Sequence, residues 1–158
     1  MIGEDKSLNP KDFFIIITAL FGNGQSSSPS NQPAPGPFPK VSFYDNVRAQ
    51  HELVTKHFGI THLRAVVGWS MGGAQSFQWA TQYPEFMDIV IPFCTSAKTS
   101  LHNKVFLEGV KSSLIAAKKL SSAGTGELGV RNSAEAFTWS AEEKNAGLRA
   151  MGRVYAGW

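Results

Sequence analysis

Short apolar blocks alternate with stretches of helical periodicity along the first part of the chain. Residues 13–18, 63–67 and 87–93 are continuous apolar blocks rich in β-branched or aromatic side chains. Such blocks predict strands that are buried on both faces, as in parallel sheets. Residues 73–82, between the second and third blocks, are expected to form a helix. The alternation predicts an α/β fold built on a parallel sheet.

Another helical pattern covers residues 42–58. Ser42 is expected to cap its first turn, with the acidic residue Asp45 three positions later. Gly59 is expected to act as its C-terminal cap. The predicted inward stripe comprises Phe43, Val47, Gln50, Val54 and His57, widened by Leu53 and Phe58.

Between the first block and this helix lies a segment that cannot form a regular element. Residues 22–39 hold five prolines, four serines and three glycines, which predicts a loop over the surface. The segment is longer than most connections within compact domains. A loop of this length is more often functional than a simple connector, and we interpret it as functional.

After residue 94 the pattern changes to helices alone. One helix is predicted over residues 103–120 and another from about Ser140, where Glu143 completes a capping box. A polar, Gly/Ser-rich break over residues 121–133 separates them. The predicted inward residues of the first of these helices are Val105, Phe106, Val110, Leu114 and Ala117. The sequence thus divides into a sheet-forming part, residues 1–97, and a helical part, residues 98–158.

The composition, 42% hydrophobic and 17% charged, is typical of a soluble globular protein. The net charge of +3 is small and the basic residues are scattered, so no nucleic-acid partner is expected. The longest apolar run, residues 13–17, is too short to span a membrane. Cys94 is the only cysteine, so a cytoplasmic protein without internal disulfides is expected. Its place at the end of an apolar run predicts a buried, unreactive thiol.

A glycine-rich turn follows the predicted strand at residues 63–67. Its sequence is Gly68-Trp69-Ser70-Met71-Gly72-Gly73. Gly-x-Ser-x-Gly between a strand and a helix is the setting of a nucleophile elbow, in which a strained turn presents the serine hydroxyl. Gly68 and Gly72 are expected to prevent Cβ collisions, and the Met71 N–H is expected to face a developing oxyanion. The alternative is a glycine-rich βα turn without catalysis.

A serine hydroxyl becomes nucleophilic only beside a base, usually a histidine oriented by a carboxylate. In folds with this elbow, the acid and then the histidine follow the serine along the chain. His102 is the only histidine after Ser70, and it lies at the start of the helical part. His51, His57 and His62 precede the elbow. All four are expected to have surface or packing roles, so the sequence predicts no triad within these residues.

Four further segments, in the same order along the chain as in a known family, accompany the elbow. They are residues 20–31 (LFGNGQSSSPSN), 44–50 (YDNVRAQ), 100–109 (SLHNKVFLEG) and 147–151 (GLRAM). Together with the elbow they resemble homoserine O-acetyltransferase-like proteins of the α/β-hydrolase superfamily. The resemblance covers nearly the whole chain and implies a partial α/β-hydrolase fold, a parallel sheet with a nucleophile elbow plus part of a helical lid.

The resemblance also implies the chemistry of the site. It implies an acyl-enzyme on Ser70, with a small-molecule acyl donor such as acetyl-CoA as co-substrate. The acceptor is a hydroxyl group, or water in esterase-like relatives. No tightly held cofactor or metal is implied, and a homodimer is compatible with it. Arg153 matches a substrate-holding arginine of the family, whereas Trp69 stands where homoserine acetyltransferases usually carry glycine.

Proteins of this family place strands and an oxyanion loop before the counterpart of Phe13, and the catalytic aspartate and histidine after the lid. The chain therefore corresponds to the middle of such an enzyme. Alone it is expected to be inactive and to expose unpaired strand edges. Two hypotheses follow: the chain belongs to a catalytic acyltransferase or hydrolase, or it is a non-catalytic remnant or interaction module derived from one.

Overall fold

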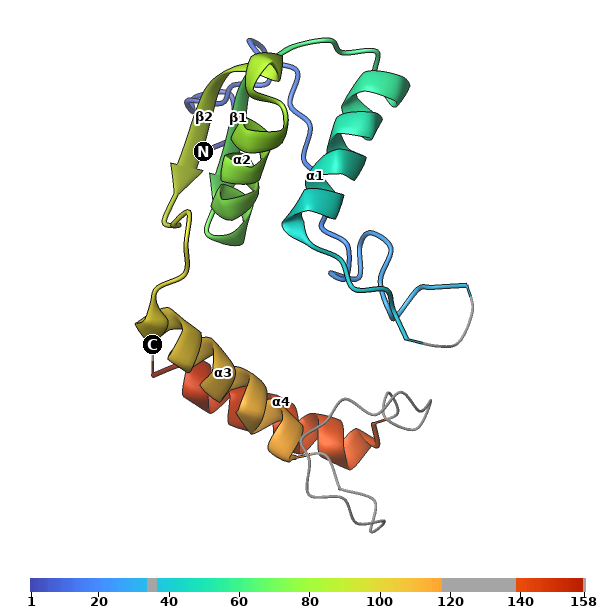
Figure 1. The fold of residues 1–158 in the computed structure, drawn as a ribbon, viewed down its shortest axis with the longest axis vertical. Coiled ribbons are helices and arrows are strands. Elements are labelled where there is room, and N and C mark those ends of the chain that lie inside the picture. Colours follow the sequence, from blue (N-terminus) through green and yellow to red (C-terminus); the bar gives the residue numbers. More distant parts are fainter. Residues whose placement is uncertain (34–36, 118–138, 158) are drawn as a thin grey trace. The chain divides into compact units, whose positions relative to one another are not determined.

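The computed structural model describes residues 1–33, 37–117 and 139–157 (Figure 1). These residues belong to two compact units, the first ending at Phe93 and the second beginning at Cys94, with Pro37 also grouped with the second. The first unit contains α1 (Phe43–Glu52), the π-helical turn η1 (Leu53–His57), β1 (Leu63–Trp69), α2 (Met71–Gln82), the 3-10 turn η2 (Pro84–Phe86) and β2 (Met87–Phe93). The second contains α3 (Leu101–Ala116) and α4 (Ala141–Tyr155). Each unit is described by itself.

The strands β1 and β2 form a parallel pair in the first unit. Their register runs from Leu63 opposite Met87 to Trp69 opposite Phe93. Helix α2 connects them and packs on both strands, and α1 packs against α2 (Figure 1). The two predicted strands, the helix between them and the parallel sheet are thus confirmed.

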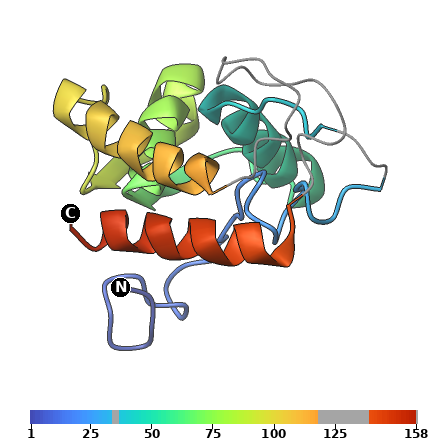
Figure 2. The same cartoon turned by 90° about the horizontal axis from the view of Figure 1, so that it is seen from below.

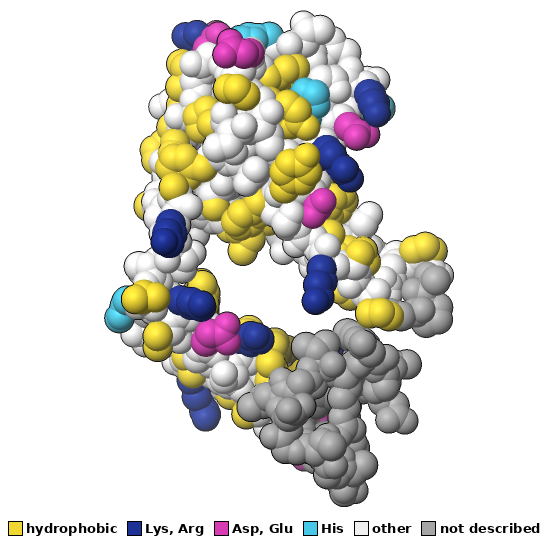
Figure 3. All heavy atoms as spheres, in the orientation of Figure 1, with side chains coloured by type: hydrophobic (Ala, Val, Ile, Leu, Met, Phe, Trp, Pro, Cys, Tyr) yellow, Lys and Arg dark blue, Asp and Glu magenta, His cyan; other side chains and the backbone are white. Residues whose placement is uncertain are grey.

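The prediction of a strand at residues 13–18 is wrong for this structure. These residues form no strand, and the side chains of Phe14 and Ile17 are 74% and 78% exposed. A strand requires a hydrogen-bonded neighbour, and the described residues supply none for this block. The apolar sequence of this block indicates a tendency to be buried. Whether it forms a strand depends on a neighbouring strand with which it can pair. Apolar side chains are exposed over much of the visible face of this unit (Figure 3).

The core of the first unit lies where α1, α2 and the start of β2 meet. Val47, Trp79 and Met87 are buried together there. A polar chain joins the two helices beside this core: the Trp79 indole N–H donates to Gln50 Oε1 (2.8 Å), and Gln50 Nε2 donates to the buried Gln75 Oε1 (2.8 Å). Pairing satisfies these amide groups, whose burial without partners would destabilise the unit.

Helix α1 begins as the sequence predicts. The Ser42 hydroxyl oxygen accepts the Asp45 N–H (3.3 Å), and the Asp45 carboxylate accepts the Ser42 N–H (2.9 Å). The predicted inward stripe is confirmed in part, because Val47 and Val54 are buried whereas Phe43 and Phe58, also assigned to the stripe, are exposed. The π-helical turn that ends this segment was not predicted. Gly59 follows it at φ +66°, in agreement with its predicted capping role.

The polar loop before α1 holds itself together with side-chain hydrogen bonds. Its centre is the buried Ser28, whose hydroxyl oxygen accepts the Gly24 N–H (2.6 Å). The Asn31 side-chain oxygen accepts the Ser28 N–H (2.7 Å). At the start of the loop, the Phe21 N–H donates to the Asn46 side chain of α1 (2.9 Å). The described part of this segment is therefore a loop held by internal hydrogen bonds, although it contains no helix or strand.

The helices α3 and α4 lie side by side in the second unit (Figures 1 and 2). The predicted capping box at Ser140 and Glu143 is present, whereas α3 begins slightly earlier than predicted, with Ser100 as its cap. Val105, predicted to face inward, is 73% exposed, because α4 covers only one side of α3. The predicted break at residues 121–133 lies outside the described residues.

Gly147 marks the close approach between α3 and α4. A Cβ atom at this position would lie 2.9 Å from Leu114 Cδ1 and 3.0 Å from the Leu114 carbonyl oxygen. The Ala117 Cβ would be 3.3 Å away. The missing side chain is therefore what allows the α4 backbone to reach α3.

We predict that Gly147→Ala separates α3 from α4 and lowers the stability of the helical pair by about 1–3 kcal/mol, the usual cost of overpacking. Gly152→Ala on the same helix is the matched control, since its Cβ would meet nothing within 4 Å. The control should gain up to about 1 kcal/mol from helix propensity. Thermal unfolding followed by circular dichroism compares the two variants. Equal stability of both would contradict the close approach at Gly147.

An aromatic cluster surrounds His51 in the first unit. Its ring stacks on Tyr83 at 3.8 Å with an interplanar angle of 8°. The Phe86 ring approaches edge-on at 4.7 Å, and the Trp79 ring lies 5.9 Å away. Burial among these rings lowers the pKa of His51, and the nearby Glu52 opposes this only in part.

The first unit should therefore lose stability in mild acid. The pKa of His51 is lowered from 6.5 on folding, so the unfolded chain binds this proton more readily. The contribution of neutral His51 is complete above pH 6.5 and is lost as the pH falls below 6.5 towards the folded-state pKa. Denaturant unfolding between about pH 5 and 8 should show this loss in the unchanged chain and not in His51→Phe. An identical pH dependence of both proteins would exclude His51 as its source.

Candidate active site

Ser70 joins β1 to α2 in a strained backbone conformation. Its φ is +52° and its ψ is −113°, a region that residues with a side chain rarely adopt. The Ser70 N–H donates to the Phe93 carbonyl at the end of β2 (2.9 Å). The Ser70 carbonyl accepts the Ala74 N–H of α2 (3.1 Å). The surrounding backbone therefore holds the turn from both the sheet and the helix.

The serine hydroxyl and the first amides of α2 remain available at this turn. The Ser70 side chain is exposed and makes no capping hydrogen bond to the helix. The intrahelical ladder begins with the Ala74 N–H, so Met71, Gly72 and Gly73 contribute the amides that a helix start leaves without intrahelical partners. These amides form the positive end of the helix dipole. A hydroxyl beside such amides is the arrangement that can stabilise an oxyanion.

Gly68 allows the strand to approach the helix. A Cβ at this position would overlap with the Gly72 carbonyl group and would lie 2.6 Å from the Gly73 nitrogen. The expected role of Gly68 in preventing a collision is therefore confirmed. The same expectation for Gly72 is wrong, because a Cβ there would meet nothing within 4 Å. Gly72 contributes its backbone to the contact and does not need to lack a side chain for it.

Two aromatic side chains lie at the strand ends beside Ser70. Trp69 stacks on Phe93 with ring centroids 6.1 Å apart and an interplanar angle of 27°. The two residues are register partners and the last residues of β1 and β2. Sequence reasoning missed Phe93, because its nearness depends on the register between two strands. The parallel alignment of the two predicted strands was the signal that could have indicated it.

A histidine–carboxylate pair exists in the first unit, but it lies at the opposite end of the sheet. His62 Nε2 is 2.8 Å from Asp88 Oδ1, and Arg64 Nη1 donates to Asp88 Oδ2 (3.1 Å). The hydrogen bond with His62, followed by that with Arg64, lowers the pKa of Asp88. His62 immediately precedes β1 and Ser70 follows it, which separates them by roughly 25 Å at the rise of an extended strand. This pair therefore cannot act as the base for Ser70.

The remaining histidines also lie in other settings. His51 is part of the aromatic cluster, and the His57 ring meets the edge of Phe58 at 4.8 Å. His102 is in α3, in the second unit. Within the described residues of the first unit, no histidine is hydrogen-bonded to Ser70. Within these residues of the first unit, the structure thus brings the elbow residues together without a histidine beside Ser70.

Cys94 differs from its prediction as a buried thiol. It is an exposed free cysteine at φ +47°. β2 ends at Phe93, so Cys94 falls just after the strand and outside the stretch that the sheet covers. The apolar run before Cys94 therefore did not predict whether the thiol is buried.

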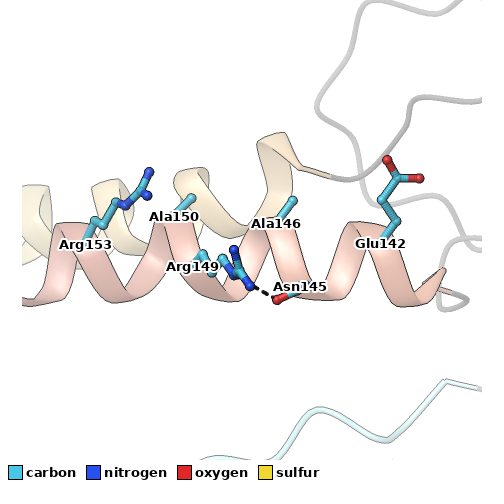
Figure 4. A pocket seen from close by; sticks show the side chains of 6 residues that line it. All are labelled: Glu142, Asn145, Ala146, Arg149, Ala150 and Arg153. Atoms are coloured by element: carbon cyan, nitrogen blue, oxygen red, sulfur yellow. Dashed lines mark hydrogen bonds between the residues drawn. The ribbon is translucent and has the colours of Figure 1, made fainter.

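Arg153 lies on α4 in the second unit. With Arg149, Glu142 and Asn145 it lines a shallow concavity of about 390 Å³ along one face of this helix (Figure 4). Arg149 Nε donates to the Asn145 side chain (3.1 Å). The substrate-holding role of Arg153 stays a prediction.

Among the residues that the structure describes, no three His, Cys, Asp or Glu side chains are grouped so that they could hold a metal ion. No helix in the same residues combines the length and the apolar character needed to cross a membrane.

Comparisons with known proteins place the chain among relatives of both predicted kinds. The family described as alpha/beta hydrolase fold matches residues 2–124. An ethyl acetate hydrolase from Pseudomonas veronii is 42% identical over 111 residues, which cover 68% of this chain and 32% of that protein. A homoserine O-acetyltransferase from Solidesulfovibrio magneticus is 34% identical over 123 residues, covering 73% of this chain and 31% of that protein.

A solved structure agrees with these relatives. The acetylester hydrolase from Corynebacterium glutamicum matches with a TM-score of 0.83 at 32% identity, over 99% of this chain and 42% of that one. The chain therefore spans about a third of the length of the curated relatives that it matches.

We predict that Gly68→Ala destabilises the first unit by about 1–3 kcal/mol, because its Cβ cannot fit against the backbone of α2. Gly72→Ala, four residues away in the same motif, is the control. It should be neutral or stabilising by up to about 1 kcal/mol, since alanine favours the helix. Denaturant unfolding of the two variants gives the comparison. Similar destabilisation by both would show that the motif, rather than the contact at Gly68, requires glycine.

Proposed function

This chain belongs to the alpha/beta hydrolase fold family, and we propose that it carries the nucleophile of an acyl-transferring enzyme, Ser70. The observation that supports this most directly is the positive φ of Ser70 between β1 and α2. A strained serine at this position costs stability, and such strain is often retained at functional sites. The Ser70 hydroxyl makes no capping hydrogen bond and lies beside the three amides at the start of α2. In a nucleophile elbow, the strained turn presents such a hydroxyl for attack on a substrate.

In the proposed reaction, Ser70 Oγ attacks the carbonyl carbon of an acyl donor. The new C–O bond places negative charge on the carbonyl oxygen, and the Met71 N–H and the positive end of α2 stabilise it. Collapse expels the alcohol or thiol of the donor and leaves an acyl group on Ser70. A hydroxyl acceptor or water then attacks the acyl group and regenerates the free serine.

The proton released from Ser70 requires a base. The His62–Asp88 pair lies at the opposite end of the sheet from Ser70, so we assign this role to a residue outside the described part of the first unit. Alone, the chain should turn over esters very slowly. The activity belongs to the whole protein, of which the matched region is about a third in the relatives.

The relatives support two versions of this reaction. An ethyl acetate hydrolase passes its acyl group to water, whereas a homoserine O-acetyltransferase passes it to a hydroxyl. Both versions use small molecules, with acetyl-CoA as the donor in the second, and neither needs a tightly held cofactor. We place the first ahead of the second because the ethyl acetate hydrolase is the more similar of the two. We further propose a cytoplasmic location, because the sequence has a single cysteine. We also propose a homodimer, with which the family resemblance is compatible.

A second candidate is a non-catalytic interaction module. The observation in its favour is that, in the described residues of the first unit, Ser70 has no histidine partner. In this case the elbow would be retained for its packing, through the contact of Gly68 with α2. The two candidates differ in whether the Ser70 hydroxyl reacts with an electrophile.

The test is labelling by a fluorophosphonate, with added imidazole as an external base. We expect label on Ser70, increased by imidazole because a free base can replace the missing one. Ser70→Ala should remove the label. Ser96→Ala should keep it, since Ser96 is another exposed serine whose hydroxyl bonds the Lys98 carbonyl (3.0 Å). Peptide mass spectrometry locates the modified residue. Undiminished labelling of Ser70→Ala would remove this serine from the mechanism and favour the interaction module.

A further inference from the structure

We infer that Trp69 and Phe93 form an aromatic wall beside Ser70 that selects esters with an uncharged, apolar substituent. The inference rests on the proposed role of Ser70 and names the substrate class of that same site. Three observations carry it: the position of the two rings, their exposure, and the scarcity of charged residues in β1, β2 and α2.

The position follows from backbone contacts. Trp69 immediately precedes Ser70, and the Phe93 carbonyl accepts the Ser70 N–H (2.9 Å). The two rings are stacked at 6.1 Å, so each restricts the other. Both residues are thus connected to the nucleophile, one through the chain and one through a hydrogen bond. Both rings therefore belong to residues that are directly attached to the backbone of the nucleophile turn.

The exposure of the wall leaves apolar surface for a ligand to cover. The side chains of Trp69 and Phe93 are 60% and 37% exposed, and Met71, the residue after Ser70, is 57% exposed. Aromatic side chains provide a large apolar area with little loss of conformational freedom on binding. Covering part of such a surface with a short alkyl group favours binding by an amount proportional to the area removed from water.

The elements around Ser70 carry very little charge. The charged residues of β1 and β2 are Arg64 and Asp88, both near the start of their strands, and α2 contains none. These two form an ion pair with each other, at the end of the sheet away from Ser70. A carboxylate or zwitterionic substituent placed against the wall would lose water without gaining a counter-charge from these elements. The wall therefore favours an uncharged ester group over that of an amino acid.

The experiment compares two fluorophosphonate probes with the same reactive phosphorus, one bearing a butyl group and the other a zwitterionic amino-acid group. In both, the bond from Ser70 Oγ to phosphorus forms, fluoride leaves, and imidazole takes the proton. We expect the unchanged chain to prefer the butyl probe by about ten-fold, as burial of some tens of Å² predicts. Trp69→Ala should reduce this ratio to near one, and Phe93→Leu, which keeps an apolar strand residue, should reduce it in part.

Phe14→Ala is the matched control, because Phe14 is an exposed aromatic residue of the same unit that contacts Phe58 instead (5.8 Å). Its ratio should equal that of the unchanged chain. Labelling at Ser70 with the same ratio in Trp69→Ala and Phe93→Leu would overturn the aromatic wall and leave the proposed function intact. No labelling of Ser70 by either probe in the unchanged chain would overturn the proposed function and the wall together.

Discussion

The backbone of Ser70 is the constraint on which the arrangement of the first unit depends. Its positive φ turns the chain from the end of β1 directly into α2. Three backbone contacts hold the turn: its N–H bonds Phe93, its carbonyl bonds Ala74, and Gly68 leaves the space that the Gly72 backbone occupies. Since the same turn starts the helix, it also sets the free amides beside the serine hydroxyl. The same backbone contacts therefore hold both the fold of this unit and the geometry of the candidate site.

The two ends of the parallel pair have different physical characters. At the start of the strands, Arg64 and Asp88 form an exposed ion pair that His62 joins. At the other end, Trp69 and Phe93 stack beside Ser70 without a charged neighbour on the same strands. Exposed ion pairs contribute little to stability, so the main effect of these charged side chains is to make that end of the sheet polar. The proposed site lies at the carboxyl end, where parallel strands of open α/β sheets form their binding sites.

Local signals in the sequence predict much of this fold. The capping boxes at Ser42 and Ser140 could be recognised because each closes within four residues. The sequence also predicted β1, β2 and the turn between β1 and α2. Apolar blocks and the spacing of glycines are signals that extend over only a few residues. The block at residues 13–18 had the same apolar signal and formed no strand. Its partner would have to come from elsewhere, and no local pattern reports that.

The sequence by itself thus determined the elbow, its serine and the order of strand and helix around it. Only the tertiary structure decided which residues share the site. It paired Phe93 with Trp69 through the strand register and kept the His62–Asp88 pair away from Ser70. It also left Cys94 and Val105 exposed, where an apolar pattern alone suggested burial. The physical reason is that hydrogen bonds of caps and turns are local, whereas burial and register depend on contacts between segments far apart in the chain.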